Sequence, residues 1–299
     1  MVRSRTGTPT VKKSKITALI PAFNEQRHIG HCLASVRWAD EVLVVDSFSS
    51  DRTPEIARAA GARVLQHEYL NSATQKNWAI PRAAHPWVLI VDADERVPES
   101  LRDEILDLLA RDAQADPSVC DGYRIGRLNH FLGRRVRFSG WRHDTVLRLF
   151  RRDLGRYQDR QVHADIILRG RRGRLRNKLL HYTFSSFDQY MEKFDRYTTW
   201  AARDRAARTA RVRWHHLTLR PLARFFKQYV LKLGFLDGRV GLVICTLSAF
   251  SAFMKYAKLL EMQELGRNGR HPTPATEHPP ATPPATTSDA AGDPNPRTG

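Results

Sequence analysis

The chain of 299 residues is long enough for one large domain with appendages or for two modest domains. Its formal net charge of +18 favours anionic partners, namely nucleic acid, an anionic membrane face or phosphorylated substrates. Cys32, Cys120 and Cys245 lie far apart and follow neither metal-ligand nor redox spacing. The cysteines therefore argue against a cysteine metal site or a disulfide framework, and they favour a reducing compartment.

The first 14 residues are basic and polar, and we expect them to be disordered. They contain no apolar segment of the kind that a secretory signal peptide carries. We therefore expect the protein to stay in the cytosol.

In the first third of the chain, short apolar runs alternate with helical patterns. The expected strands are 16–20, 41–45, 63–65 and 87–91, and further helices are expected near 73–83 and 98–111. After the second strand, Thr53 is a candidate helix cap and Pro54 a candidate first residue of a short helix. This alternation predicts an α/β fold with a mostly parallel sheet and right-handed crossovers.

The rest of the chain has a different pattern. Strands are expected at 122–128, 145–150 and 162–168, and helices from residue 187 onward. Residues 240–254 are apolar between Arg239 and Lys255, but a membrane span needs about 20 such residues, so a buried or interfacial helix is expected. From residue 266 the composition is rich in Pro, Thr and Ala, which predicts a disordered tail.

Acidic side chains follow two of the expected parallel strands. Asp46 ends the second strand, and Asp92, Asp94 and Glu95 directly follow the buried run 87–91. In an open α/β sheet the carboxyl ends of neighbouring strands form one crevice, and carboxylates there suit a hard divalent cation. The alternative is ordinary turn chemistry, with acids that cap the following helix.

Taken together, three motifs make this sequence resemble the glycosyltransferase family 2 domain, which has the GT-A fold and uses nucleotide-sugar donors. The motifs are Pro21-Ala22-Phe23-Asn24-Glu25, the loop from Asp46 to Thr53, and Asp92-Ala93-Asp94. The resemblance implies a Rossmann-like, mostly parallel sheet flanked by helices over residues 15–185. A helical, membrane-proximal extension would follow at 186–265.

The resemblance also implies roles for particular residues. Pro21, Phe23 and Glu25 would line the nucleotide pocket, and Asp46 would accept a hydrogen bond from the base. Asp92 would face the ribose or the sugar. The metal ligands would be Asp94, which binds Mg²⁺ or Mn²⁺ on the donor diphosphate, and His181, for which a structural role is the alternative. Lys76 is a further candidate for the pocket, but a solvated helix face is preferred for this side chain.

A longer set of motifs resembles a subgroup that adds a β-linked glucose to the inner heptose of the lipopolysaccharide core. These motifs are Gly140-Trp141-Arg142-His143-Asp144, the run 147–152, Val162-His163 and His181-Tyr182-Thr183. The subgroup implies an inverting transferase with UDP-glucose as the favoured donor. A carboxylate would remove the acceptor proton. Asp144 is preferred over Asp165 for this role, and pairing with a nearby arginine is the alternative for both.

The acceptor implied by this subgroup is an anionic glycan with a lipid anchor. It would be bound at the inner leaflet by Arg134, Arg135, Arg137 and the later arginine clusters. Anionic lipid is thus an expected partner and nucleic acid is not. We expect a cytoplasmic protein that is peripheral on the inner face of the cell membrane.

Three other functions compete with this one. A nucleic-acid-binding protein would explain the charge, but the sequence carries no recognised binding motif. An inactive GT-A scaffold at a membrane would retain the fold without the chemistry. A nucleotidyltransferase also uses paired acids, but no Gly-rich, Lys-terminated phosphate loop lies near Ile20.

Overall fold

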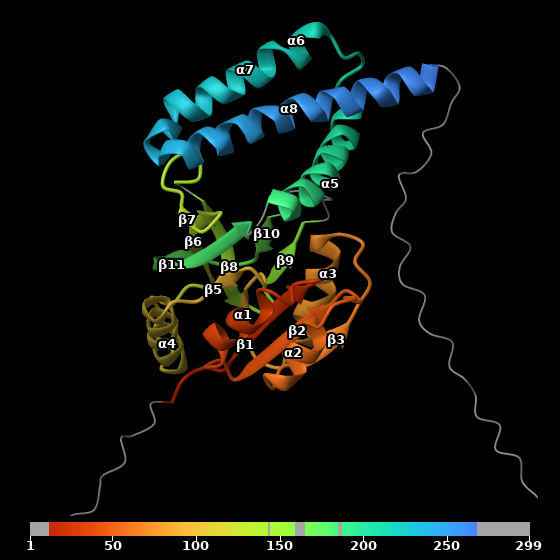
Figure 1. Cartoon of the computed structure of the whole chain (residues 1–299). Coiled ribbons are helices and arrows are strands. Elements are labelled where there is room, and N and C mark those ends of the chain that lie inside the picture. Colours follow the sequence, from red (N-terminus) through yellow and green to blue (C-terminus); the bar gives the residue numbers. More distant parts are fainter. Residues whose placement is uncertain (1–11, 143, 159–164, 185–186, 268–299) are drawn as a thin grey trace, which may run out of the picture.

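The computed structural model describes residues 12–142, 144–158, 165–184 and 187–267. Its centre is a nine-stranded sheet with the order β3-β2-β1-β4-β8-β6-β11-β5, and β7 pairs with β6 (Figure 1). The strands of this sheet are β1 (Ile16–Ala22), β2 (Glu41–Asp46), β3 (Arg63–Gln66), β4 (Trp87–Ile90), β5 (Glu95–Arg96), β6 (Gly122–Phe131), β7 (Arg134–Arg135), β8 (Thr145–Arg151) and β11 (Arg172–Phe184). A separate two-stranded sheet is formed by β9 (Gly155–Tyr157) and β10 (Ile166–Leu168).

The sheet is mixed. β1 pairs in parallel with both β2 and β4, and β2 pairs in parallel with β3. β8 is antiparallel to its neighbours β4 and β6, and β6 pairs in parallel with β11. The predicted α/β class is confirmed. The pairs among β1 to β4 are parallel, and the antiparallel strand β8 separates them from the parallel pair of β6 and β11.

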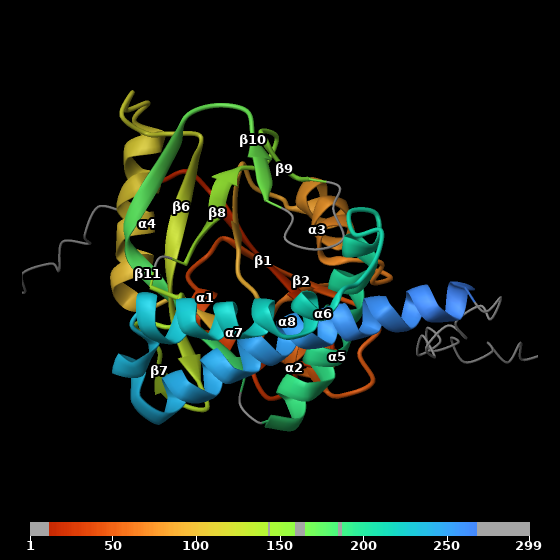
Figure 2. The same cartoon turned by 90° about the horizontal axis from the view of Figure 1, so that it is seen from above.

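Helices cover both faces of the sheet (Figure 2). These helices are α1 (Ile29–Val36), α2 (Thr53–Ala59), α3 (Ser72–Ala79) with the 3-10 turn η1 (Ile80–Arg82), and α4 (Glu99–Ala113). Trp87 and Leu89 of β4 pack in one core cluster with α1 and α4, whereas Val88 and Ile90 pack in the other cluster with α3. β4 is therefore buried on both faces, which explains its unbroken apolar run.

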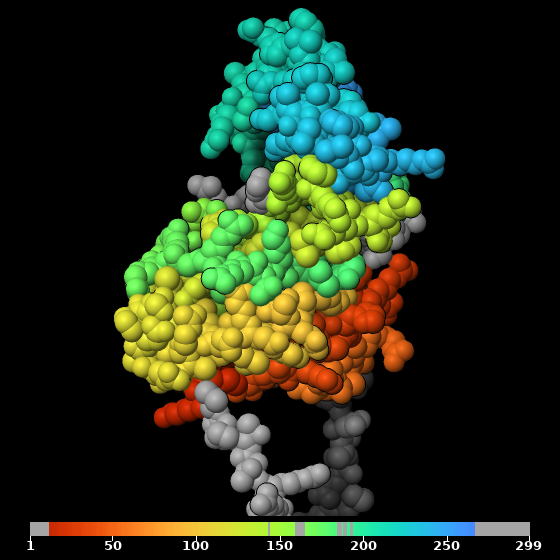
Figure 3. Space-filling model, turned by 90° about the vertical axis from the view of Figure 1, so that its left-hand side faces the viewer, coloured from red at the N-terminus to blue at the C-terminus, as the bar shows by residue number. Residues whose placement is uncertain are grey.

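The last described part of the chain, residues 187–267, forms what we call the helical arm. It consists of α5 (Phe187–Ala206), α6 (Trp214–Leu217), α7 (Leu219–Phe226), the π-helical turn η2 (Lys227–Leu231), the 3-10 turn η3 (Gly234–Asp237) and α8 (Gly238–Arg267). In Figures 1 and 2, α7 runs alongside α8. Figure 3 shows the arm standing above the part of the molecule that carries the sheet.

A polar clamp joins the helical arm to the sheet. The carboxylate of Asp237 accepts hydrogen bonds from the backbone N–H of Arg137 at 2.9 Å and of Phe138 at 3.0 Å, and from Oγ of Ser139 at 2.8 Å. A small apolar cluster around Phe131 and Ile244 reinforces this contact. Because the clamp involves three donors from one turn, it fixes where α8 begins relative to β6 and β7.

The final helix differs from its prediction. The apolar segment was predicted at 240–254, but α8 has 30 residues. By length and composition alone, residues 234–266 form a helical stretch long and apolar enough to cross a membrane. Only 28% of its most apolar window is buried, so α8 is not a fully buried core helix, and the interfacial alternative stays a prediction. The apolar side chains of α8 are divided, since Leu242, Val243, Phe250 and Phe253 are exposed whereas Ile244, Ala252 and Leu259 are buried.

Candidate functional site

The three predicted strand ends meet at one edge of the sheet. In the strand register, Asp46 of β2 lies opposite Ala22 of β1, and Ile90 of β4 lies opposite Leu19 of β1. The acidic residues that follow β4 therefore lie beside the ends of β1 and β2. This juxtaposition follows from the parallel pairing of these strands.

Hydrogen bonds join the loops that follow β1 and β2. The backbone N–H of Ser50 donates to Oδ1 of Asn24 at 2.9 Å, and that of Asn24 donates to Oγ of Ser49 at 2.9 Å. Buried Asp46 accepts hydrogen bonds from the N–H and the hydroxyl of Ser49. Asn24 adopts a left-handed φ of 54°, which asparagine tolerates better than most residues do. The two loops thus form one preorganised rim.

Thr53 has a different role from the one predicted. It is the first residue of α2, and Arg52 stands at the cap position. The Thr53 hydroxyl instead accepts the backbone N–H of Glu25 at 2.8 Å and donates to the carboxylate of Asp51. The sequence pattern favoured a local cap because the actual partner of this threonine lies 28 residues away.

Two aromatic side chains stand exposed on the rim. Phe23 follows β1 and is 47% exposed, and Phe48 follows β2 and is 46% exposed. Phe48 has a left-handed φ of 56°, a conformation that few non-glycine residues adopt. The sequence predicted Phe23 as a pocket residue and missed Phe48. Pro21 and Glu25 are partly buried beside them.

Asp92 lies in a buried network of charges. Nζ of Lys76 is 3.1 Å from Oδ1 of Asp92, and the Arg148 guanidinium contacts both carboxylate oxygens. Burial by itself would raise the pKa of Asp92, but the charges of Arg148 and Lys76 hold it well below its usual range. The solvated-face interpretation of Lys76 is wrong, because α3 packs against the sheet and buries this side chain.

Glu95 extends the network into the sheet. Its fully buried carboxylate accepts the backbone N–H of Asp92 at 3.0 Å and lies 3.5 Å from Arg148 and 3.6 Å from Arg127. The sequence missed both arginines as site residues. A signal was present, because Arg148 interrupts the apolar strand at 145–150, and a charge within a buried strand needs a partner of opposite charge.

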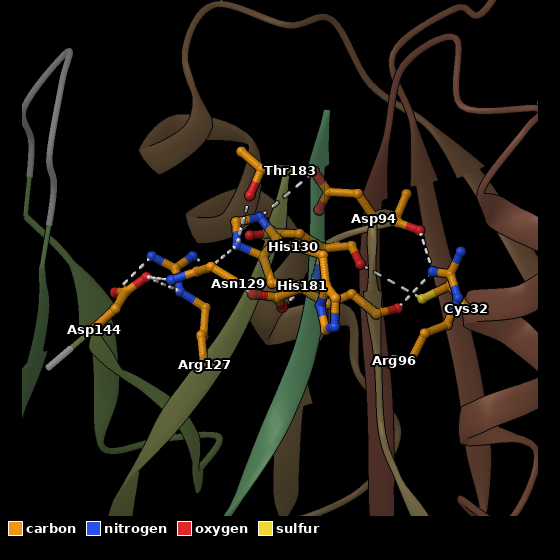
Figure 4. Close-up of polar contacts among 12 residues, drawn as sticks. Cys32, Asp94, Arg96, Arg127, Asn129, His130, Asp144, His181 and Thr183 are labelled. Carbon is orange, nitrogen blue, oxygen red and sulfur yellow. Dashed lines mark hydrogen bonds and ion pairs between the residues drawn. The ribbon is translucent and has the colours of Figure 1, made fainter. Parts of the chain in front are cut away.

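Asp94 and His181 face each other across the end of the sheet (Figure 4). Nε2 of His181 is 3.6 Å from Oδ2 of Asp94, while Nδ1 contacts Oδ1 of Asn129 at 2.6 Å. The amide nitrogen of Asn129 donates to Asp144 at 2.9 Å, which fixes the orientation of the amide. Nδ1 of His181 therefore carries a proton toward Asn129, and Nε2 is directed at Asp94.

Two opposing effects shift the pKa of His181. Burial lowers the pKa of His181, but the hydrogen bond and the charge of Asp94 outweigh it, so the pKa is raised. In the residues that the structure describes, no group of three His, Cys, Asp or Glu side chains is arranged to hold a metal ion. Any cation at Asp94 and His181 would need further ligands from a substrate or from water.

Asp144 is fixed by its neighbours. Its carboxylate accepts two hydrogen bonds from Arg127, at 2.8 and 2.9 Å, in addition to the one from Asn129. Burial opposes ionisation, but Arg127 and Asn129 outweigh it and lower the pKa of Asp144. The arginine-partner alternative thus describes Asp144, whose oxygens are occupied. Of the other predicted motif residues, His143, Val162 and His163 lie outside the described residues.

A cavity of about 650 Å³, which we call the arm cavity, lies between the sheet and the helical arm. Lys76, Arg127, Arg148 and Tyr157 line it from the sheet side, together with exposed Asp165. Tyr197 and Trp200 of α5, Arg224 of α7 and Lys255 of α8 line it from the arm. Lys76 and Arg148, which line the cavity, also contact Asp92 at the acidic edge of the sheet. By contrast, Arg134, Arg135 and Arg137 do not line it.

The sequence model of glycosyl transferase family 2 matches residues 17–179. The lipopolysaccharide core biosynthesis glycosyltransferase LpsC of Rhizobium meliloti (strain 1021) is 31% identical over 247 residues, which cover 80% of this chain and 87% of that protein. An uncharacterized glycosyltransferase of Rickettsia felis is 29% identical over 79% of this chain and 86% of its own length. Among solved structures, S. aureus TarS 1-349 in complex with UDP-GlcNAc is 15% identical, with a TM-score of 0.45 over 87% of this chain and 93% of that chain.

Proposed function

Because the chain belongs to glycosyltransferase family 2, we propose that it transfers a sugar from a nucleoside-diphosphate donor to a glycan of the lipopolysaccharide-core class. Glucose from UDP-glucose is the first donor to test, and inversion at the anomeric carbon is the expected course. The main support for this proposal is the position of Asp92 and Asp94 beside the rim formed by the loops after β1 and β2. The similarity to LpsC, which extends over most of both chains, supports the acceptor class.

We propose Asp94 and His181 as the protein ligands of Mg²⁺ or Mn²⁺. Two ligand atoms of one magnesium ion lie about 3 Å apart, because each is about 2.1 Å from the ion. The 3.6 Å between Oδ2 of Asp94 and Nε2 of His181 suits this arrangement after a small adjustment. The donor diphosphate would supply the remaining oxygen ligands, and the ion would neutralise charge that develops on the leaving group.

The neighbouring residues would bind and orient the donor. Lys76 and Arg148 hold Asp92 ionised at the end of β4, where its carboxylate can accept hydrogen bonds from ribose or sugar hydroxyls. Phe23, with Pro21 and Glu25, would cover the nucleobase, and Asp46 would fix the rim that receives it. Since both loops are already joined by hydrogen bonds, little ordering entropy would be lost when the donor binds.

A carboxylate must take the proton of the attacking hydroxyl. Asp144 is bound on both oxygens by Arg127 and Asn129, and its lowered pKa makes it a weak base. Asp165 is exposed and lines the arm cavity. The geometry therefore favours Asp165 over Asp144, which reverses the order taken from the sequence.

We also propose that the helical arm rests on the inner face of the cell membrane. Between Asp204 and Asp237 there is no acidic residue, but there are eight basic ones, namely Arg205, Arg208, Arg211, Arg213, Arg220, Arg224, Lys227 and Lys232. The same stretch exposes Leu222, Phe226 and Leu231 by more than half of their surface. Exposed apolar side chains among basic ones suit an anionic leaflet, where a lipid-anchored acceptor would lie within reach of the arm.

The first experiment measures hydrolysis of a panel of nucleotide sugars, beginning with UDP-glucose, in Mn²⁺, Mg²⁺ or EDTA. We expect slow, metal-dependent release of the nucleoside diphosphate that is lost in Asp94→Ala. The matched control is Asp153→Ala, because this exposed carboxylate pairs only with the adjacent Arg152 among the described residues. If no nucleotide sugar is bound or hydrolysed in any metal, the protein is an inactive scaffold or a basic binding protein, and the proposal is wrong.

A further inference from the structure

The arm cavity carries more positive charge than its own carboxylates balance. Five cationic side chains line it, namely Lys76, Arg127, Arg148, Arg224 and Lys255, against the single lining carboxylate of Asp165. The three cations from the sheet have carboxylate partners, since Lys76 and Arg148 bind Asp92 and Arg127 binds Asp144. The surplus charge therefore comes from the helical arm.

The two cations from the arm have no acidic partner among the described residues. Nε of Arg224 donates to Oγ of Ser248 at 2.8 Å, and Nζ of Lys255 lies 4.7 Å from the centre of the Tyr256 ring. Within the described part of the chain, neither forms an ion pair. Both side chains nevertheless contact α8, Arg224 through Ser248 and Lys255 through its neighbour Tyr256.

Two further arginines lie around this pair. Arg220 donates to the hydroxyl of Tyr256, and Nε of Arg205 is buried without a hydrogen-bond acceptor in the described structure. Burial lowers the pKa of Lys255, and although Tyr256 opposes this, Arg224, Arg205 and Arg220 lower it further. Like charges at close range destabilise one another, so an anion that binds among them would gain their combined attraction.

The wall beside these cations is aromatic. Tyr197 and Trp200 of α5 pack edge to face, with ring centres 5.7 Å apart, and both line the cavity. Aromatic side chains present apolar faces that suit the C–H face of a sugar ring, while the surrounding polar groups take its hydroxyls. Cations and aromatic faces together select a ligand that is both anionic and saccharide-like.

We infer that the arm cavity binds the acceptor as a phosphorylated saccharide, with its phosphate between Arg224 and Lys255 and a sugar ring against Tyr197 and Trp200. The inference rests on the proposed transferase function and adds the acceptor's chemistry and its binding residues. A phosphate suits this site better than a carboxylate, because it offers three oxygens and up to two charges to several cations. From this position the saccharide extends toward Asp165, which lines the same cavity, and toward Asp92, which Lys76 and Arg148 of the cavity wall contact.

The test measures binding of the full chain to core oligosaccharide that has been freed of lipid by deacylation. The probe is used with its phosphates and again after their removal with hydrofluoric acid. We expect the wild type to bind the phosphorylated form and to lose roughly tenfold or more in affinity for the dephosphorylated form. Arg224→Gln/Lys255→Gln should weaken binding of the phosphorylated form by a similar factor. It should not change the affinity for the dephosphorylated form.

The matched control is Arg37→Gln/Arg58→Gln, which removes the same charge from exposed positions at the end of α1 and in α2, outside the cavity. This control should bind both forms as the wild type does. The charge-preserving variant Arg224→Lys/Lys255→Arg should retain most of the binding, so that a folding defect in the glutamine variant is recognised. An equal loss in the control and the cavity variant would overturn the inference, as would equal affinity of the wild type for both forms.

Two further measurements distinguish a phosphorylated saccharide from a lipid headgroup and from free phosphate. If the cavity variant loses affinity for phosphatidylglycerol vesicles but not for the oligosaccharide, the cluster binds lipid headgroups and the inference is wrong. If inorganic phosphate binds as tightly as the phosphorylated oligosaccharide, the saccharide part of the inference is wrong.

Donor hydrolysis is measured separately from oligosaccharide binding. Oligosaccharide binding without any nucleotide-sugar turnover would remove the transferase proposal while the binding site stands, and turnover without oligosaccharide binding would remove the site alone.

Discussion

Lys76 and Asp92 form an ion pair at 3.1 Å in which the lysine is almost fully buried, although α3 looks like a polar surface helix in the sequence. Asp92 is paired on its other side with Arg148, which also reaches Glu95. The two cations thus share one carboxylate, but only Arg148 connects it to the rest of the buried network. Removal of Arg148 should therefore lower the unfolding free energy more than removal of Lys76.

Arg148→Met should destabilise the protein by about 3–5 kcal/mol, because it removes from the buried network a cation that Asp92 and Glu95 share. Lys76→Met should cost less, about 1–3 kcal/mol, since Arg148 still neutralises Asp92. Urea denaturation followed by circular dichroism measures both values. Arg152→Met is the control, because its ion pair with Asp153 is exposed, and it should change the unfolding free energy by less than about 1 kcal/mol. Equal losses in Arg148→Met and Lys76→Met would contradict the network.

The roles of Asp144 and Asp165 can be separated by comparing transfer with stability. Asp165→Asn should slow sugar transfer to the oligosaccharide acceptor by about 10²–10⁴-fold, the usual contribution of a general base. It should leave the unfolding free energy nearly unchanged, since Asp165 is exposed. Asp144→Asn should lower the unfolding free energy by about 1–3 kcal/mol, because Arg127 loses a bidentate partner. If Asp144→Asn abolishes transfer at full stability while Asp165→Asn does not, Asp144 is the base.

Much of the acidic edge of the sheet could be predicted from the sequence because its signals are local. β4 and the acids after it are contiguous, and so are the motif after β1 and the loop after β2. The buried position of Lys76 could not be predicted, because α3 has few large apolar residues and the partners of Lys76 lie 16 and 81 residues further along the chain, at Asp92 and Tyr157. The two-residue strand β5 is too short to leave a pattern, yet its pairing with β11 brings His181 beside Asp94.

Acid should weaken a contact that joins α4 to the sheet. Asp112 accepts hydrogen bonds from Oγ of Ser14 at 2.6 Å and Nε1 of Trp87 at 2.8 Å, and it pairs with Arg151. Burial opposes ionisation, but these partners outweigh it and lower the pKa of Asp112. A lowered pKa stabilises the fold above the unfolded value of about 3.9 and loses this contribution as pH falls through the folded value.

The stability difference between wild type and Asp112→Asn should therefore be constant above about pH 5 and should shrink as the pH falls below about 4. Chemical denaturation at a series of pH values, followed by tryptophan fluorescence, measures this difference. Asp103→Asn is the control, because Asp103 is exposed and pairs with Arg102 on the surface of α4. A difference that grows on acidification would show that the folded state raises the pKa of Asp112.

Membrane binding should depend on the apolar side of the helical arm. Leu222, Phe226 and Leu231 are 66%, 56% and 67% exposed and lie on or next to α7, among basic residues. Their combined replacement by serine should lower partitioning onto phosphatidylglycerol vesicles at least roughly 100-fold, because each buried apolar side chain contributes about 1.5–3 kcal/mol. Leu70→Ser/Ile167→Ser is the control, because it changes exposed apolar residues outside the arm and should sediment with vesicles as the wild type does. High salt should weaken binding of all three proteins, since it screens the basic residues. If the arm variant sediments like the control, the arm does not insert its apolar side chains, and any membrane binding is electrostatic alone.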